Sequence, residues 1–192
     1  MDTIFALATS EGKSGVAIIR VSGKNAFQVF EKFSCSPVKP NGMGLRKLLV
    51  NNKLLDEALI LCFGEGHSFT GEKVVEIHHH GSLAIIQMCL SVLGSIRNFR
   101  MANPGEFTKR AFENGQLDLS QVEGLSALID AETTVQLDQA QRVFRGDPTG
   151  AGLVGPKPAS EYIPADNTPR MLRYYFGLGK GLGSKDAIAY QY

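Results

Sequence analysis

Hydrophobic positions in the first 144 residues recur with two periods, one typical of strands and the other typical of helices. The strand period predicts five strands, at residues 3–8, 16–21, 45–50, 54–63 and 73–78. The helix period predicts helices at residues 25–33 and 83–96. The second of these is apolar nearly all round, which is typical of a buried helix.

Two further helices are indicated by the residues at their starts. Asn103 as N-cap, followed by Pro104 and then Glu106, predicts a helix that runs to Asn114 and stops at Gly115. A capping box that begins at Ser120 predicts one long helix to about Phe144. The apolar residues of this long helix form two stripes that each need a partner surface: Val122, Leu125 and Ile129, then Leu137, Ala140 and Phe144.

The composition changes near residue 145. All five tyrosines lie within residues 162–192, and residues 145–192 hold eight of the 21 glycines and five of the eight prolines. One interpretation is a flexible extension, because tails of this composition rarely fold. We favour the other, in which residues 145–192 are an irregular tail foreign to the preceding domain, produced by truncation or a frame shift.

Overall composition indicates a soluble, cytoplasmic protein. Apolar residues make up 43% of the chain, and a net charge of +1 creates no field that would draw it to nucleic acid or lipid. The longest apolar stretch, residues 83–96, is too short to span a membrane, and no export signal is evident. The three cysteines lie far apart in apolar runs, as expected of buried thiols.

Two motifs that could bind a nucleotide or a metal are set aside. The Gly12-Lys13-Ser14 sequence lacks the earlier glycine of a P-loop, because Leu7 stands at that position. Three consecutive histidines, 78–80, follow Glu76, and strand alternation places Glu76, His78 and His80 on one face. A zinc site is conceivable. Polar residues at a strand end are the favoured interpretation, since His67 is the only other histidine.

Two charged residues interrupt apolar strand positions. Arg20 follows residues 17–19, and Glu76 follows residues 74–75. Each strand adjoins a glycine-containing turn, at residues 12–15 and 69–72, where backbone can approach a ligand closely. By spacing alone, a solvated strand end remains the favoured interpretation of both charges.

Several segments nevertheless occur together in an order that is specific to one family. These are residues 2–4, 16–23, 68–72, Glu76 with 80–81, 104–112 and 117–119. Over residues 1–144 the chain closely resembles the N-terminal part of the tRNA modification GTPase family MnmE, also called TrmE. The resemblance implies an α+β fold, a mixed sheet with helices that is similar to the tetrahydrofolate-binding domain of aminomethyltransferases. It also implies a folate-binding and dimerisation domain at residues 1–117 and the first helix of a truncated helical domain at 118–144.

The resemblance further implies a ligand and residues that contact it. The ligand is a reduced folate one-carbon carrier, either 5-formyl- or 5,10-methylene-tetrahydrofolate. The family's folate-contacting arginine and glutamate fall on Arg20 and Glu76, and a third contact, a lysine in the family, is Gln116 here. A carboxylate can accept the adjacent N–H and amino groups of a pterin as a pair, and an arginine suits an oxygen-rich acceptor.

The family's partners and activity define the remaining expectations. The family forms homodimers and, with the FAD-dependent protein MnmG, modifies carbon 5 of the wobble uridine of certain tRNAs by using GTP and potassium. This chain contains no P-loop, switch or guanine-specificity motif, so we expect no GTP or potassium binding and assign no catalytic residue. Two alternatives remain open: a non-functional frame-shifted fragment and an aminomethyltransferase-like folate enzyme.

Overall fold

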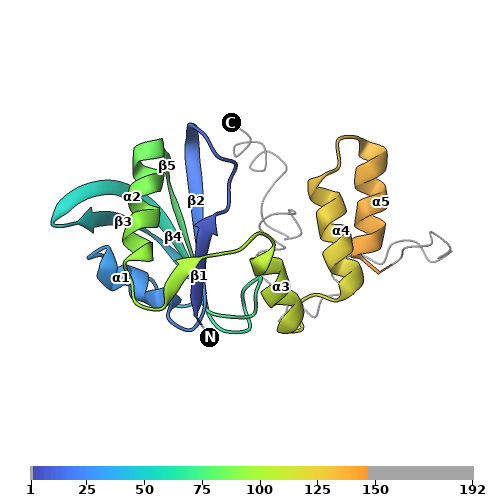
Figure 1. Ribbon diagram of the computed structural model, residues 1–192, viewed down its shortest axis with the longest axis horizontal. Helices are drawn as coiled ribbons and strands as arrows, with labels where there is room; N and C mark the ends of the chain where they lie inside the picture. The colour runs from blue at the N-terminus through green and yellow to red at the C-terminus, as the bar shows by residue number, and fades with distance from the viewer. Residues whose placement is uncertain (1, 147–192) are drawn as a thin grey trace.

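A six-stranded mixed sheet forms the centre of the computed structural model, which describes residues 2–146 (Figure 1). Its strand order is β3-β4-β5-β2-β1-β6, and all neighbours are antiparallel except β1 and β6. The strands are β1 (Thr3–Leu7), β2 (Ser14–Ser22), β3 (Gly42–Val50), β4 (Lys53–Phe63), β5 (Val74–Gly81) and β6 (Phe99–Met101). The predicted α+β class with a mixed sheet is therefore confirmed, and the likeness to aminomethyltransferases stays a prediction.

Helices α1 (Val29–Lys32) and α2 (Leu83–Gly94), with the short 3-10 helix η1 (Ala26–Gln28), cover one face of the sheet. The main core lies between them and alternate residues of the central strands. These core residues include Ile19, Val21, Val75 and Ile77 of the sheet and Cys89, Val92 and Leu93 of α2. All three cysteines are free, and burial raises the pKa of Cys62 and Cys89 to about 12.

The prediction that α2 is buried all round is wrong. Leu83 and Met88 are each 45% exposed, whereas Cys89 and Leu93 are fully buried. A single layer of helix covers this face of the sheet, so the outer side of α2 meets solvent whatever its side chains are.

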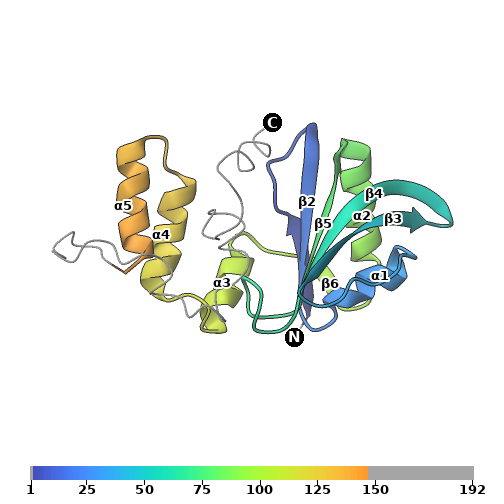
Figure 2. The ribbon, with the colours of Figure 1, turned by 180° about the vertical axis from the view of Figure 1, so that it is seen from behind.

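Helix α3 (Glu106–Glu113) lies on the opposite side of the sheet and leads to α4 (Leu119–Ile129) and α5 (Thr134–Phe144) (Figure 2). Gly115 follows α3 with a φ of +69°, which confirms the predicted stop. Helix α3 starts later than predicted, because its N-cap is Gly105, with a φ of +73°, and not Asn103.

The prediction of one long helix over residues 120–144 is also wrong. Thr133 caps a second helix with a capping box to Gln136, and Asp118, rather than Ser120, caps the first with a box to Gln121. The two helices form a hairpin in which Gly124 and Ala140 are buried. Of the two predicted apolar stripes only Ala140 is buried, and Ile129 stays 76% exposed and Leu137 38% exposed. The predicted irregular tail, residues 145–192, lies outside the described residues from 147 onwards.

Gly124 sets the closeness of this hairpin. A Cβ at this position would lie 2.5 Å from the backbone nitrogen of Phe144 and 2.6 Å from its Cα. In an isolated helix Gly→Ala stabilises by about 1 kcal/mol. We expect the reverse for Gly124→Ala. The stability of the hairpin should fall by about 1–3 kcal/mol, because the backbones of α4 and α5 must move apart to admit the added methyl group. Hydrogen exchange of α4 and α5 amides measures this, with Ser126→Ala on the exposed side of α4 as the control; slower exchange in Gly124→Ala would contradict the prediction.

Candidate functional site

Arg20 and Glu76 form an ion pair on the sheet face that looks toward α3. They are directly opposite each other on the antiparallel strands β2 and β5. Arg20 Nε donates to Glu76 Oε1 at 2.9 Å, and the Glu76 side chain is 1% exposed against 14% for Arg20. Strand alternation explains this placement, because Ile19 and Val21 beside Arg20 point into the core on the other face.

A second residue contacts the same carboxylate. His78 Nε2 lies 3.3 Å from Glu76 Oε2, two residues along β5 on the same face. Burial raises the pKa of Glu76, but the hydrogen bond from His78 and the charge of Arg20 outweigh burial, so the net pKa lies below the usual value. The sheet face thus carries a buried carboxylate that stays ionised at neutral pH.

Two aromatic rings lie against Arg20. Its Cζ atom is 5.7 Å from the centroid of the Phe69 ring and 5.7 Å from that of the Phe107 ring. Phe69 belongs to the loop between β4 and β5, and Phe107 belongs to α3. Both distances are in the range of cation–π attraction, so the rings restrict the guanidinium as well as shielding it from water.

Gln116 lies beside the loop that carries Phe69. A Cβ added to Gly71 would be 3.1 Å from Gln116 Cγ, and Asn114 donates from Nδ2 to the Thr70 carbonyl at 2.7 Å. The structure therefore brings Arg20 and Glu76 into direct contact and connects Gln116 to them through the loop. The predicted roles of these three residues in binding stay predictions.

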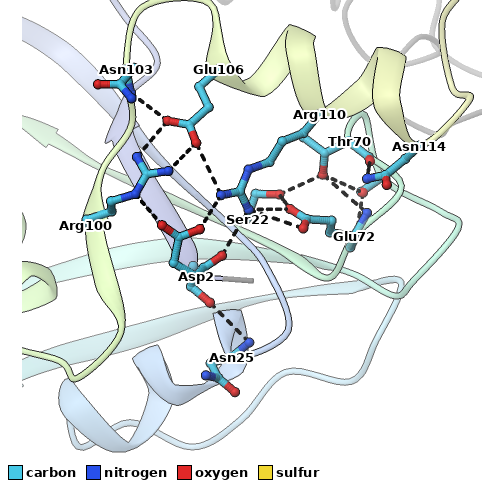
Figure 3. Close-up of polar contacts among 12 residues, drawn as sticks. Asp2, Ser22, Asn25, Thr70, Glu72, Arg100, Asn103, Glu106, Arg110 and Asn114 are labelled. Atoms are coloured by element: carbon cyan, nitrogen blue, oxygen red, sulfur yellow. Dashed lines mark hydrogen bonds and ion pairs between the residues drawn. The ribbon is translucent and has the colours of Figure 1, made fainter.

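A network of ion pairs joins α3 to this loop and to the N-terminus of the chain (Figure 3). Arg110, 7% exposed, donates to both carboxylate oxygens of Glu72 and to Asp2. Arg100 binds Asp2 and Glu106, and its hydrogen bond lowers the pKa of Glu106 to about 2. Sequence analysis did not assign a role to Arg110 or Glu72, although both lie in segments that carry the family resemblance.

The other histidines of strand β5 do not assemble a metal site. His80 donates or accepts at Nδ1 with Asp56 at 2.8 Å, and His79 faces the core. Within residues 2–146 no group of three or more His, Cys, Asp or Glu side chains is arranged to hold a metal ion. Of the three consecutive histidines only His80 is exposed, so the interpretation as polar residues at a strand end describes His80 but not the buried His78 and His79.

His79 should make the fold sensitive to acid. It is 2% exposed, its Nδ1 hydrogen-bonds the His80 carbonyl, and its Nε2 is buried without a partner. Burial lowers its pKa, so below about pH 6.5 the unfolded chain takes up a proton that the folded chain resists. We expect the free energy of unfolding to fall as pH drops from 7.5 to 5.5. Urea titrations of the wild type and His79→Leu measure this; an equal pH dependence in both proteins would contradict it.

A cavity of about 710 Å³ lies away from the ion pair. It is lined by α1, α2 and the β3–β4 turn, and its lining includes Gln28, Asn52, Met88 and Ser95. This places it on the face of the sheet that holds the main core. The charged, aromatic-lined face and this cavity are therefore separate candidate sites.

Comparison with known proteins shows the family of the chain, and both candidate sites lie in the matched part. Residues 3–116 match the family model described as the N-terminus of the GTP-binding protein TrmE. The chain belongs to this family. Arg20, Glu76, Phe69 and Phe107 lie within the matched TrmE N-terminal segment, as do all members of the α3 network except Asp2.

Individual relatives agree with the family match. The tRNA modification GTPase MnmE of Cereibacter sphaeroides strain ATCC 17025 is 51% identical over 146 residues, which covers 76% of this chain and 34% of the relative. The protein of the same name from strain ATCC 17029 is 45% identical over 192 residues, which covers 93% of this chain and 45% of the relative. That of Ruegeria sp. strain TM1040 is 50% identical over 147 residues, covering 76% and 34%. The chain thus spans less than half the length of these relatives.

Among the described residues, no helix has the length and apolar character needed to cross a membrane.

The match with the strain ATCC 17029 protein extends beyond the described residues, whereas the other two cover about three-quarters of the chain. The origin of residues 145–192 and the boundaries at 117 and 144 stay predictions.

Proposed function

We propose that the chain binds a reduced folate one-carbon carrier, 5-formyl- or 5,10-methylene-tetrahydrofolate, on the face that holds Glu76 and Arg20. The observation that supports this most strongly is the buried Glu76 carboxylate, which stays ionised. A fully buried charge is costly unless it is paired and its remaining hydrogen-bond positions are satisfied. A carboxylate has about four acceptor positions, more than its contacts with Arg20 and His78 use. The adjacent N–H and amino groups of a pterin match the remaining positions.

The surroundings of Glu76 suit the rest of such a ligand. Phe69 and Phe107 provide flat apolar surfaces beside the carboxylate, against which a planar pterin can stack. Arg20 offers a guanidinium for an oxygen of the one-carbon group or of the folate carboxylates. Gln116, next to Gly71, provides an uncharged donor farther out, in place of the family's lysine.

The relatives' name supports a wider role. We propose that the bound carrier serves modification of carbon 5 of the wobble uridine in tRNA, as a cytoplasmic homodimer with a FAD-dependent partner protein. GTP hydrolysis is part of the relatives' name, and the residues of this chain supply no nucleotide-binding motif for it. For these residues the proposed part is binding of the carrier.

Isothermal titration of the 192-residue chain with 5-formyl-tetrahydrofolate tests the proposal. We expect saturable binding with one ligand for each chain and no heat of binding with GTP. p-Aminobenzoylglutamate, which lacks the pterin, should bind far more weakly, because Glu76 is the proposed pterin contact. Equal binding of the two compounds, or no binding of the folate, would contradict the proposal.

A further inference from the structure

The two rings that hold Arg20 come from separate parts of the chain. Phe69 lies in the loop between β4 and β5, and Phe107 lies in the first turn of α3. A loop and a single short helix have no hydrogen-bonded ladder to fix them against each other. Another contact must therefore set the distance between the rings.

Arg110 makes that contact (Figure 3). It lies three residues after Phe107, on the same side of α3. Its Nη1 donates to Glu72 at 3.1 Å and 3.2 Å, and its Nη2 donates to Asp2 Oδ1 at 2.8 Å. Glu72 lies three residues after Phe69, so the ion pair joins the two ring-bearing segments close to both rings.

Glu72 extends the connection to the strand that carries Arg20. Ser22 donates from Oγ to Glu72 Oε2 at 2.7 Å, and the Ser22 and Thr70 hydroxyls are also 2.7 Å apart. Ser22 is two residues from Arg20 on β2, and its side chain therefore leaves the same face of the sheet. Loop and strand are thus fixed to α3 through the Arg110 guanidinium and the Glu72 carboxylate. Asn114 at the end of α3, which donates from Nδ2 to the Thr70 carbonyl at 2.7 Å, is a second link to the loop.

We propose that Arg110 is a positioning residue of the folate site, which holds the Phe69 loop against α3 so that both rings face Arg20. This inference rests on the proposed function. Arg110 itself does not contact the ligand. It affects binding by holding the Phe69 ring in place.

Arg100 provides a matched control for Arg110. Within the described residues it shares the partners Asp2 and Glu106 with Arg110 but does not reach Glu72 or the loop. Loss of either arginine removes ion pairs from α3. Only loss of Arg110 releases the loop.

The test measures 5-formyl-tetrahydrofolate affinity and melting temperature for Arg110→Gln and Arg100→Gln, each made in the wild type and in Phe69→Leu. We expect Arg110→Gln to weaken binding about tenfold in the wild type and less than about twofold in Phe69→Leu, because the ring through which it acts is gone. Its effect on the melting temperature should be the same in both backgrounds. Arg100→Gln should change affinity less than about twofold in either.

Three outcomes would overturn the inference alone, provided the wild type binds. They are unchanged affinity in Arg110→Gln, an equal loss in Arg100→Gln, and an undiminished loss in the Phe69→Leu background. Failure of the wild type to bind would instead overturn the proposed function and the inference with it. If Arg110→Gln does not fold, Glu72→Gln weakens the same link from the loop side, and the same results are expected of it.

Discussion

Glu76→Ala is expected to weaken 5-formyl-tetrahydrofolate binding more than any other single substitution at the site. Removal of the carboxylate leaves two donors of the pterin unpaired in a water-poor place, which costs about 1–3 kcal/mol, or roughly 5- to 150-fold in affinity. Gln116→Ala should change affinity less, because this half-buried side chain lies beside Gly71 and carries no charge. Isothermal titration of the three proteins measures the difference.

Glu76→Gln separates binding from folding in this experiment. It keeps the shape of the side chain but replaces an acceptor oxygen with a donor amide, so the pterin pair is still lost. Urea unfolding of each variant shows whether the sheet is intact, since Arg20 and His78 both lose their carboxylate partner. Equal affinities of the wild type, Glu76→Ala and Gln116→Ala would remove Glu76 from the site.

Gly23→Ala is expected to cause a large loss of stability. Gly23 has a φ of +141°, which other residues rarely adopt, and a Cβ there would lie 2.6 Å from Thr3 Oγ1 and 2.8 Å from Thr3 Cα. Backbone strain and the clash together should cost about 3 kcal/mol or more. For a domain of this size that corresponds to a fall in melting temperature of roughly 10 °C.

Gly15→Ala is the matched control for this prediction. Gly15 lies on β2, which Gly23 directly follows, but a Cβ at Gly15 meets nothing within 4 Å and the φ of Gly15 is not in the left-handed region. We expect no loss of stability, because alanine only reduces the freedom of the unfolded chain. Thermal unfolding followed by circular dichroism compares the two, and similar melting temperatures for both variants would contradict the assignment of Gly23 as a close-packed position.

The local pattern of the sequence predicted most of the fold but not the segments shaped by distant contacts. All five strands with a clear period are present, whereas β6 was missed because Phe99–Met101 is too short to show one. It forms by parallel pairing with Thr3–Phe5, about a hundred residues away in sequence. The long helix was predicted because no proline or glycine run interrupts residues 120–144. The competing cap at Thr133 and the close approach at Gly124 produce two helices instead.

The candidate site shows the same division. Arg20 and Glu76 were selected through the family resemblance, since spacing alone favoured solvated strand ends. The register that places them opposite each other, and the burial of Glu76, depend on pairing across 56 residues. Arg110 could not be selected locally, because its partners Asp2 and Glu72 are 108 and 38 residues away. Within the sequence of α3 alone, nothing distinguishes Arg110 from any other basic residue.

A structure of the chain with 5-formyl-tetrahydrofolate bound tests the central proposal most directly, because the described residues offer more than one place that could hold a ligand. The account predicts the pterin on the α3 side of the sheet, with its N–H and amino groups within hydrogen-bond distance of Glu76 and its ring against Phe69 or Phe107. A folate seated instead in the cavity between α1, α2 and the β3–β4 turn, with Glu76 still contacting only Arg20 and His78, would contradict it.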